Sequence, residues 1–186
     1  MSPASDPLPR ASVLLSALID ASASHVVGLP DNGSAALFDL LEHNPAVSLL
    51  TVTREGEAFA IASGLWLGGQ HPVVLIQNTG LLESGDSLRG TAARMGVPLL
   101  CLVGYRGYAR MIAREIDPHT RPLTRDDLTR NDLDSTALLT EPTLRAWGIP
   151  YRLYGSDRDA PLVAEAWDRA HREARPVALL LTRSLA

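Results

Sequence analysis

Short apolar runs that alternate with helical patterns constrain the fold of this chain more than any other feature. The runs occupy residues 25–29, 48–53, 73–76, 97–103, 149–153 and 177–181. Most are continuous, without the polar alternation of a half-exposed strand, which indicates strands covered on both faces of a parallel sheet. The sequence therefore predicts an α/β fold with three layers, in which a mainly parallel six-stranded sheet lies between helices.

Helical patterns fill the intervals between these runs. Amphipathic spacing or helix-forming composition predicts helices over residues 9–22, 34–43, 58–69, 83–95, 140–147 and 159–173. Residues 1–8 are rich in Pro and Ser and are expected to form a disordered tail, which leaves 9–186 as a single domain. Residues 105–135 form a long, charged excursion with one helical segment expected between 107 and 116. Excursions of that length in a compact domain commonly carry function.

Composition excludes several classes of protein. The net charge of −4 argues against a nucleic-acid or anionic-membrane surface, each of which needs a basic patch. All 17 basic residues are arginine, so neither a Schiff-base lysine nor a phosphate-loop lysine is present. The sequence shows no secretory signal pattern and no membrane-spanning apolar stretch, and a cytoplasmic location is expected. Cys101 lies within an apolar run and is predicted to be a buried thiol.

Glu55 is the first candidate for chemistry because it follows the apolar run 48–53 and precedes a segment of very small residues. A carboxylate there, like Glu57, can simply stabilise a helix N-terminus. The small side chains that follow let another helix or subunit approach closely. A Glu on such a helix would lose water and hold its proton more readily, which suits proton transfer.

Polar residues follow three other predicted strands. They are Gln77, Asn78 and Thr79 after the run 73–76, Asp31 after 25–29, and Arg106 after 97–103. The carboxyl ends of parallel strands meet at one edge of a sheet, where ligands bind in open α/β folds. A turn, a helix cap and a surface ion pair, respectively, are the structural alternatives for these three groups.

Common motifs for nucleotide binding and acyl transfer are absent from the sequence. No GxGxxG follows a predicted strand, and the chain has no phosphate loop and no GxSxG motif. Its five histidines are scattered without the spacing of metal ligands, so no metal site is predicted within the chain.

At four motifs the sequence resembles the pyrimidine-binding (PYR) domain of thiamine diphosphate enzymes, most of all sulfopyruvate decarboxylase α subunits and the N-terminal domain of phosphonopyruvate decarboxylases. The motifs are GLPD at 28–31, TREGEAFAIASGLWLGG at 53–69, LIQNTGL at 75–81 and YRG at 105–107. Glu55, Ala58, Ala62 and Gly64 fill the family pattern E-x-x-A-x-x-x-A-x-G. The family usually continues QNSGLGN, whereas this chain reads QNTGLLESGDSL, so the resemblance leaves the substrate open.

The resemblance implies roles for individual residues. Glu55 would hydrogen-bond the aminopyrimidine ring of thiamine diphosphate and favour the tautomer that removes the thiazolium C2 proton. Pro30, Gln77 and Asn78 would also contact the cofactor. Asp31, Asn78, Thr79 and Arg106 would contact a small 2-oxo acid, whose decarboxylation the cofactor promotes as an electron sink.

The resemblance also implies a partner, because the family holds the cofactor diphosphate through Mg²⁺ on a GDG…N motif in another domain. Here the nearest match, Gly85-Asp86-Ser87, lacks the second glycine. A separate β subunit with that motif is therefore expected to hold Mg²⁺ and complete the active site in an α2β2 or higher assembly. A lyase that joins the bound aldehyde to an acceptor, and a non-catalytic binding, regulatory or dimerisation module, are the alternatives.

Overall fold

A computed structural model describes residues 7–118 and 122–186, and it contains a six-stranded sheet in the order β2-β1-β3-β4-β6-β5. The strands are β1 (His25–Gly28), β2 (Ser48–Thr51), β3 (Pro72–Gln77), β4 (Leu100–Gly104), β5 (Tyr151–Tyr154) and β6 (Val177–Leu181). Every pairing between neighbouring strands is parallel. From β1 the chain passes to β2 on one side and then returns past β1 to β3 on the other side. The strand order therefore reverses between β1 and β3.

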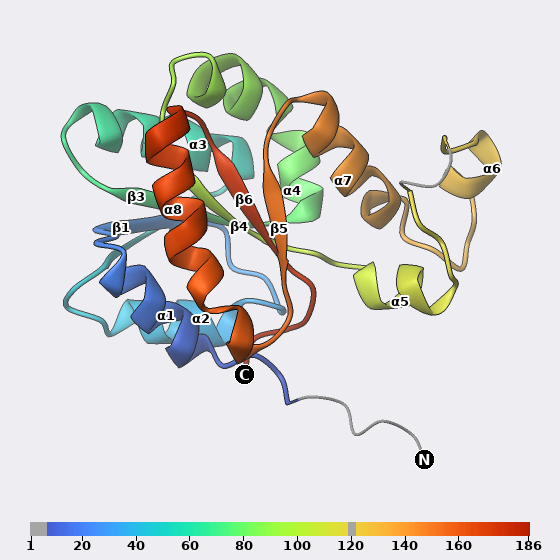
Figure 1. Cartoon of the computed structure of the whole chain (residues 1–186), viewed down its shortest axis with the longest axis horizontal. Coiled ribbons are helices and arrows are strands. Elements are labelled where there is room, and N and C mark those ends of the chain that lie inside the picture. Colours follow the sequence, from blue (N-terminus) through green and yellow to red (C-terminus); the bar gives the residue numbers. More distant parts are fainter. Residues whose placement is uncertain (1–6, 119–121) are drawn as a thin grey trace.

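Helices cover both faces of this sheet (Figure 1). One layer contains α1 (Ala11–Asp20), α2 (Ala35–Glu42) and α8 (Pro161–Glu173), and the other contains α3 (Glu55–Leu67), α4 (Asn78–Glu83), the π-helix η1 (Ser87–Ala93) and α7 (Ser135–Ala146). The short elements are α5 (Tyr108–Ala113), α6 (Arg125–Leu128) and the 3₁₀ turn η2 (Asp157–Asp159). The predicted three-layer α/β fold is confirmed.

The core lies on both sides of the central strands. In β3, Val73 and Leu75 pack beneath α1, α2 and α8, while Val74 and Ile76 pack beneath the other layer. This arrangement explains why the strand is a continuous apolar run, since neither face meets water. Cys101 is buried in β4 as predicted, and burial raises the pKa of its thiol to about 12.

Two predicted helices were placed incorrectly. The helix expected at 83–95 is two elements, because the chain turns into α4 directly at Asn78 and continues as η1 after Ser84. Residues 77–80 are therefore a strand end and a helical turn, not an open loop. The helix expected from 140 begins at Ser135, because the Asp134 side chain accepts a hydrogen bond from the Thr136 N–H at 3.0 Å and caps it.

Part of the excursion, together with Leu8 and Arg183 near the chain ends, lies at the carboxyl edge of the sheet. The excursion contains α5 and α6, so the single helical segment expected there is joined by a second. Six residues of the predicted disordered tail 1–8 lie outside the described part of the chain, and Pro7 accepts a hydrogen bond from Arg183. Among the described helices, none is both long and apolar enough to cross a membrane.

Candidate functional site

A groove with a volume of about 880 Å³ runs along the carboxyl edge of the sheet. The segments that follow β1, β3, β4 and β6 line it, and they bring together Asp31, Gln77, Arg106, Arg110 and Arg183. Three of the predicted site residues, Asp31, Gln77 and Arg106, thus share one surface although they lie far apart in the sequence. The groove lies beside the point where strand order reverses, which is the ligand-binding position of open α/β sheets.

Glu55 is the first residue of α3 and is half-buried. Its side chain lies against Gly80 in α4, where a Cβ atom would come within 2.1 Å of the Glu55 Cγ and 2.3 Å of its Oε1. Within the described residues, no hydrogen-bond donor or ion-pair partner contacts the Glu55 carboxyl. The glycine of the QNTG segment therefore leaves room for a carboxyl that is open to a ligand. Sequence reasoning missed this role of Gly80, although the resemblance included the residue.

Glu57 has a different role from Glu55, two residues away on the same helical turn. Its Oε2 accepts hydrogen bonds from the Thr53 N–H and hydroxyl, both at 3.1 Å, and from the Arg54 N–H at 3.2 Å. These bonds hold the pKa of Glu57 below its usual value, with the Thr53 backbone contributing most. Glu57 is thus a helix cap, and Glu55 is the carboxyl available for chemistry.

Asp31 closes the turn that follows β1. Its Oδ1 accepts the Gly33 N–H at 2.6 Å and its Oδ2 accepts the Ser34 hydroxyl at 2.7 Å. Asp31 still faces the groove, whereas the neighbouring Pro30 is exposed and is not among the lining residues. The predicted contacts of Pro30 with a cofactor and of Asp31 with a substrate stay predictions.

Asn78 is fully buried and does not line the groove. Its Nδ2 donates to the Arg106 carbonyl at 3.0 Å and to the Thr140 hydroxyl at 3.1 Å, and its Oδ1 has no partner within the described residues. Asn78 therefore fastens the start of α4 to the end of β4 and to α7. Its predicted contacts with cofactor and substrate stay predictions, and this packing is the role that the structure gives it.

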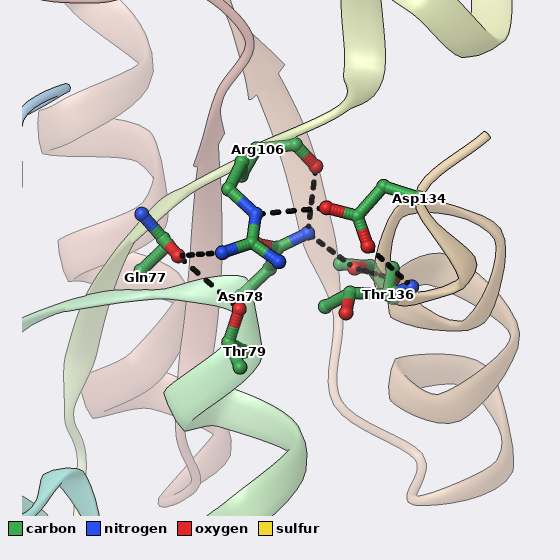
Figure 2. Close-up of polar contacts among 7 residues, drawn as sticks. Gln77, Asn78, Thr79, Arg106, Asp134 and Thr136 are labelled. Carbon is green, nitrogen blue, oxygen red and sulfur yellow. Dashed lines mark hydrogen bonds and ion pairs between the residues drawn. The ribbon is translucent and has the colours of Figure 1, made fainter. Parts of the chain in front are cut away.

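The Arg106 guanidinium is held by groups from two elements (Figure 2). Its Nε donates to Asp134 Oδ2 at 2.8 Å, and its Nη1 donates to Gln77 Oε1 at 3.2 Å. The Thr79 hydroxyl donates to the same Gln77 oxygen at 3.1 Å. Gln77, Thr79 and Arg106 thus form one network with Asp134. Sequence analysis did not identify Asp134, because it placed the start of the following helix at residue 140 and not at Ser135.

A buried group of side chains supports this network from behind. The Tyr105 hydroxyl donates to the Ala137 carbonyl at 3.0 Å and to Glu141 at 3.1 Å, and the Tyr151 hydroxyl donates to the other Glu141 oxygen at 2.7 Å. Burial, followed by the charge of Glu141, raises the pKa of Tyr105, and burial raises that of Tyr151 to about 12. Both hydroxyls stay protonated as donors, and they fix α7 against the end of β4 and the start of β5.

Acidification is expected to release Arg106 from Asp134. Partial burial raises the pKa of Asp134, but hydrogen bonds from Arg106 and the Thr136 backbone outweigh it and hold the pKa below its usual value. The stabilisation is therefore complete above the unfolded-state pKa of about 4 and is lost as pH falls through the folded-state value. Asp134→Asn keeps the cap, and at pH 7 it should cost roughly 1 kcal/mol of unfolding free energy, since the pair is partly exposed.

Urea unfolding between pH 7 and pH 3 measures this effect. The difference between Asp134→Asn and the unmodified chain should disappear at the acid end. The matched control is Asp86→Asn, because Asp86 is almost fully exposed and its pair with Arg89 is long, at 3.4 Å. A pH-independent difference for Asp134→Asn would contradict the assignment.

Comparisons with known proteins show the family to which the chain belongs. The family described as "Thiamine pyrophosphate enzyme, N-terminal TPP binding domain" matches residues 10–118. The chain belongs to this family. Sulfopyruvate decarboxylase subunit alpha from Methanothermobacter thermautotrophicus is 26% identical over 163 residues, which cover 87% of this chain and 88% of that subunit.

A longer sequence relative and a longer structural neighbour also match the chain. Phosphonopyruvate decarboxylase from Streptomyces viridochromogenes is 33% identical over 97 residues, which cover 52% of this chain and 24% of that protein. Benzoylformate decarboxylase from Polynucleobacter necessarius has a TM-score of 0.68 at 18% identity, covering 95% of this chain and 30% of that one. The last likeness is one of fold. The chain spans about a quarter to a third of these two proteins.

The residues present fit the aminopyrimidine end of thiamine diphosphate. The Glu55 carboxyl is half-buried, has no partner within the described residues and lies in a space that a side chain at position 80 would fill. Such a group can share a proton with a ring nitrogen of an aminopyrimidine. For the diphosphate end, no three His, Cys, Asp or Glu side chains of residues 7–118 and 122–186 gather as a metal site.

Proposed function

We propose that this chain is the α, pyrimidine-binding subunit of a heteromeric thiamine diphosphate-dependent 2-oxo acid decarboxylase of the sulfopyruvate or phosphonopyruvate type. The open Glu55 carboxyl at the start of α3, seated against Gly80, is the observation that carries the proposal. The match with nearly the whole length of a sulfopyruvate decarboxylase α subunit supports it. When bound, thiamine diphosphate supplies the electron sink for loss of carbon dioxide.

In this proposal the residues of this chain bind and orient the pyrimidine ring of the cofactor and the 2-oxo acid. Glu55 holds a proton at a pyrimidine ring nitrogen, and the groove along β1, β3, β4 and β6 receives the 2-oxo acid. Among the described residues that line the groove, arginines 106, 110 and 183 outnumber the one carboxylate, Asp31, which favours an anionic substrate.

The proposal assigns Mg²⁺ and the diphosphate to a separate β subunit, because the sequence has neither a GDG…N motif nor a lysine. The surface of α3 is suited to contact with that subunit. Ala60, Ile61 and Gly64 lie exposed along one side, with Ile61 at 40% exposure, and a Cβ at Gly64 would meet nothing within 4 Å. Small residues let a second surface approach the helix backbone closely.

Co-expression with the products of neighbouring genes tests the proposed function. We expect a GDG…N-bearing protein to co-purify, and the complex to release carbon dioxide from a 2-oxo acid only with thiamine diphosphate and Mg²⁺. A panel of 2-oxo acids, including sulfopyruvate and phosphonopyruvate, would give the substrate. Product analysis for joined carbon skeletons distinguishes a carboligating lyase. Failure of the complex to bind thiamine diphosphate in the presence of Mg²⁺ would favour the non-catalytic module.

A further inference from the structure

The orientation of the Gln77 carboxamide is fixed by its neighbours. Its Oε1 accepts from the Arg106 Nη1 at 3.2 Å and from the Thr79 hydroxyl at 3.1 Å. An arginine side chain has donors and no acceptor, so the oxygen of the amide, and not its nitrogen, must face Arg106. Arg106 is itself held by the ion pair with Asp134. The direction of the Gln77 amide is therefore set by α7 as well as by the strand end.

The nitrogen of the same amide is left with both of its donors available. Figure 2 shows the Gln77 nitrogen on the side away from Arg106, and no donor or acceptor among the described residues contacts it. Gln77 is half-buried and lines the groove. An amide NH₂ group held in one orientation at the wall of a groove can donate one N–H to a carboxylate oxygen of a ligand, and its second N–H, which points in another direction, can donate to a different acceptor.

The floor beside Gln77 is open because the neighbouring strand position is a glycine. Gly104 pairs with Gln77 in the sheet register, and a Cβ there would lie 3.8 Å from the Gln77 Cα and 3.6 Å from Asp31 Oδ2. A side chain at this position would occupy the space between the two groove residues. Because the described part of the lining has three arginines and one carboxylate, Asp31, a negative ligand is favoured over a positive one.

We propose that Gln77 recognises the carboxylate of the 2-oxo acid through an Nε2 N–H donor, and that Arg106 and Thr79 are positioning residues that hold the amide in this orientation. The inference rests on the proposed function, which it deepens by assigning the group that binds the acid. In place of the direct substrate contact expected for Arg106, this arginine acts through Gln77. Its ion pair with Asp134 makes the start of α7 part of the same support.

Nuclear magnetic resonance of the ¹⁵N-labelled chain tests the proposal, with pyruvate as the probe. The Gln77 side-chain NH₂ signals, identified by their loss in Gln77→Glu, should shift during the titration with pyruvate. Methyl pyruvate, the ester without the charge, should leave them in place. Absence of a shift with pyruvate overturns the proposal, as does an equal shift with the ester.

Three variants distinguish direct binding of pyruvate by Gln77 from positioning of the Gln77 side chain by Arg106. Gln77→Glu keeps an oxygen for Arg106 and Thr79 but faces the groove with another oxygen, so pyruvate affinity should fall at least tenfold. Gln70→Glu adds the same charge at an exposed position outside the groove and should bind pyruvate like the unmodified chain. Arg106→Met should weaken binding about fivefold and move the Gln77 NH₂ signals before pyruvate is added. Equal affinity for Gln77→Glu and Gln70→Glu overturns the proposal.

The assembled enzyme distinguishes failure of this inference from failure of the proposed function. If the unmodified complex releases carbon dioxide, Gln77→Glu should raise KM for the 2-oxo acid tenfold or more with a smaller change in kcat. An unchanged KM refutes the role of Gln77 while the decarboxylase assignment stands. A complex that binds no thiamine diphosphate and releases no carbon dioxide refutes the proposed function instead.

Discussion

Replacing Glu55 with glutamine should lower carbon dioxide release by the assembled enzyme about 100-fold or more. The carboxamide preserves the size of the side chain and its packing against Gly80, but it has no acidic proton to share with a pyrimidine nitrogen. Folding should be unaffected, because within the described residues the Glu55 carboxyl makes no hydrogen bond that the change would break. The measurement is kcat for carbon dioxide release at saturating thiamine diphosphate, accompanied by a binding titration of the cofactor.

Glu57→Gln is the matched control for this experiment. Both glutamates lie in the first turn of α3, so the two variants change the helix dipole and the net charge equally. The Glu57 carboxylate is engaged by Thr53 and Arg54, and a glutamine oxygen can still accept those bonds. Turnover should stay within about twofold, because a glutamine at this position still caps the helix. Turnover of Glu55→Gln within tenfold of the unmodified enzyme would show that the mechanism is wrong.

Gly28→Ala should destabilise the fold by about 3 kcal/mol. Gly28 ends β1 between β2 and β3, and a Cβ there would lie 1.9 Å from the Leu75 carbonyl oxygen. That oxygen is a backbone atom that accepts the Leu29 N–H, so it can move only if the β1–β3 pairing shifts. Thermal unfolding should show the midpoint fall by roughly 6–12 °C.

Gly64→Ala, by contrast, should slightly stabilise the fold. Gly64 lies inside α3, and a Cβ there would meet nothing within 4 Å. Alanine is favoured over glycine in a helix interior by about 1 kcal/mol, so this variant should unfold at a slightly higher temperature. If Gly28→Ala and Gly64→Ala unfold at the same temperature, the close approach between β1 and β3 does not limit stability.

The pattern of apolar runs was sufficient to predict the sheet. A strand that is buried on both faces is apolar along nearly its whole length, as β3 and β6 are. Each strand could therefore be predicted from its own residues, without knowledge of long-range contacts. Element ends were less accurate, because caps such as Asp134 act over two or three residues and are hard to distinguish from other polar turns. The immediate entry of Asn78 into α4 was missed because no side-chain cap marks the start of that helix.

Glu55 was identified from the sequence because its signal is local. It combines a strand end, a helix start and a segment of small residues within one stretch, and the resemblance to thiamine diphosphate enzymes adds the pattern that follows it. The resemblance singled out Glu55 and gave no role to Glu57, which can stabilise the helix N-terminus. The physical basis of this difference, an engaged carboxylate at Glu57 and an open one at Glu55, required the side-chain contacts.

The sequence by itself determined the parallel α/β sheet, the edge at which its polar residues gather and the glutamate that begins α3. Only the tertiary structure decided how those polar residues divide their roles. The buried Asn78 side chain donates a hydrogen bond to Thr140, 62 positions later in the chain. The side chain of Gln77, one residue earlier, lines the groove and has its N–H donors available there. That division depends on where α7 lies against the sheet, and no local pattern at residues 77 and 78 encodes the position of a helix so distant in the chain.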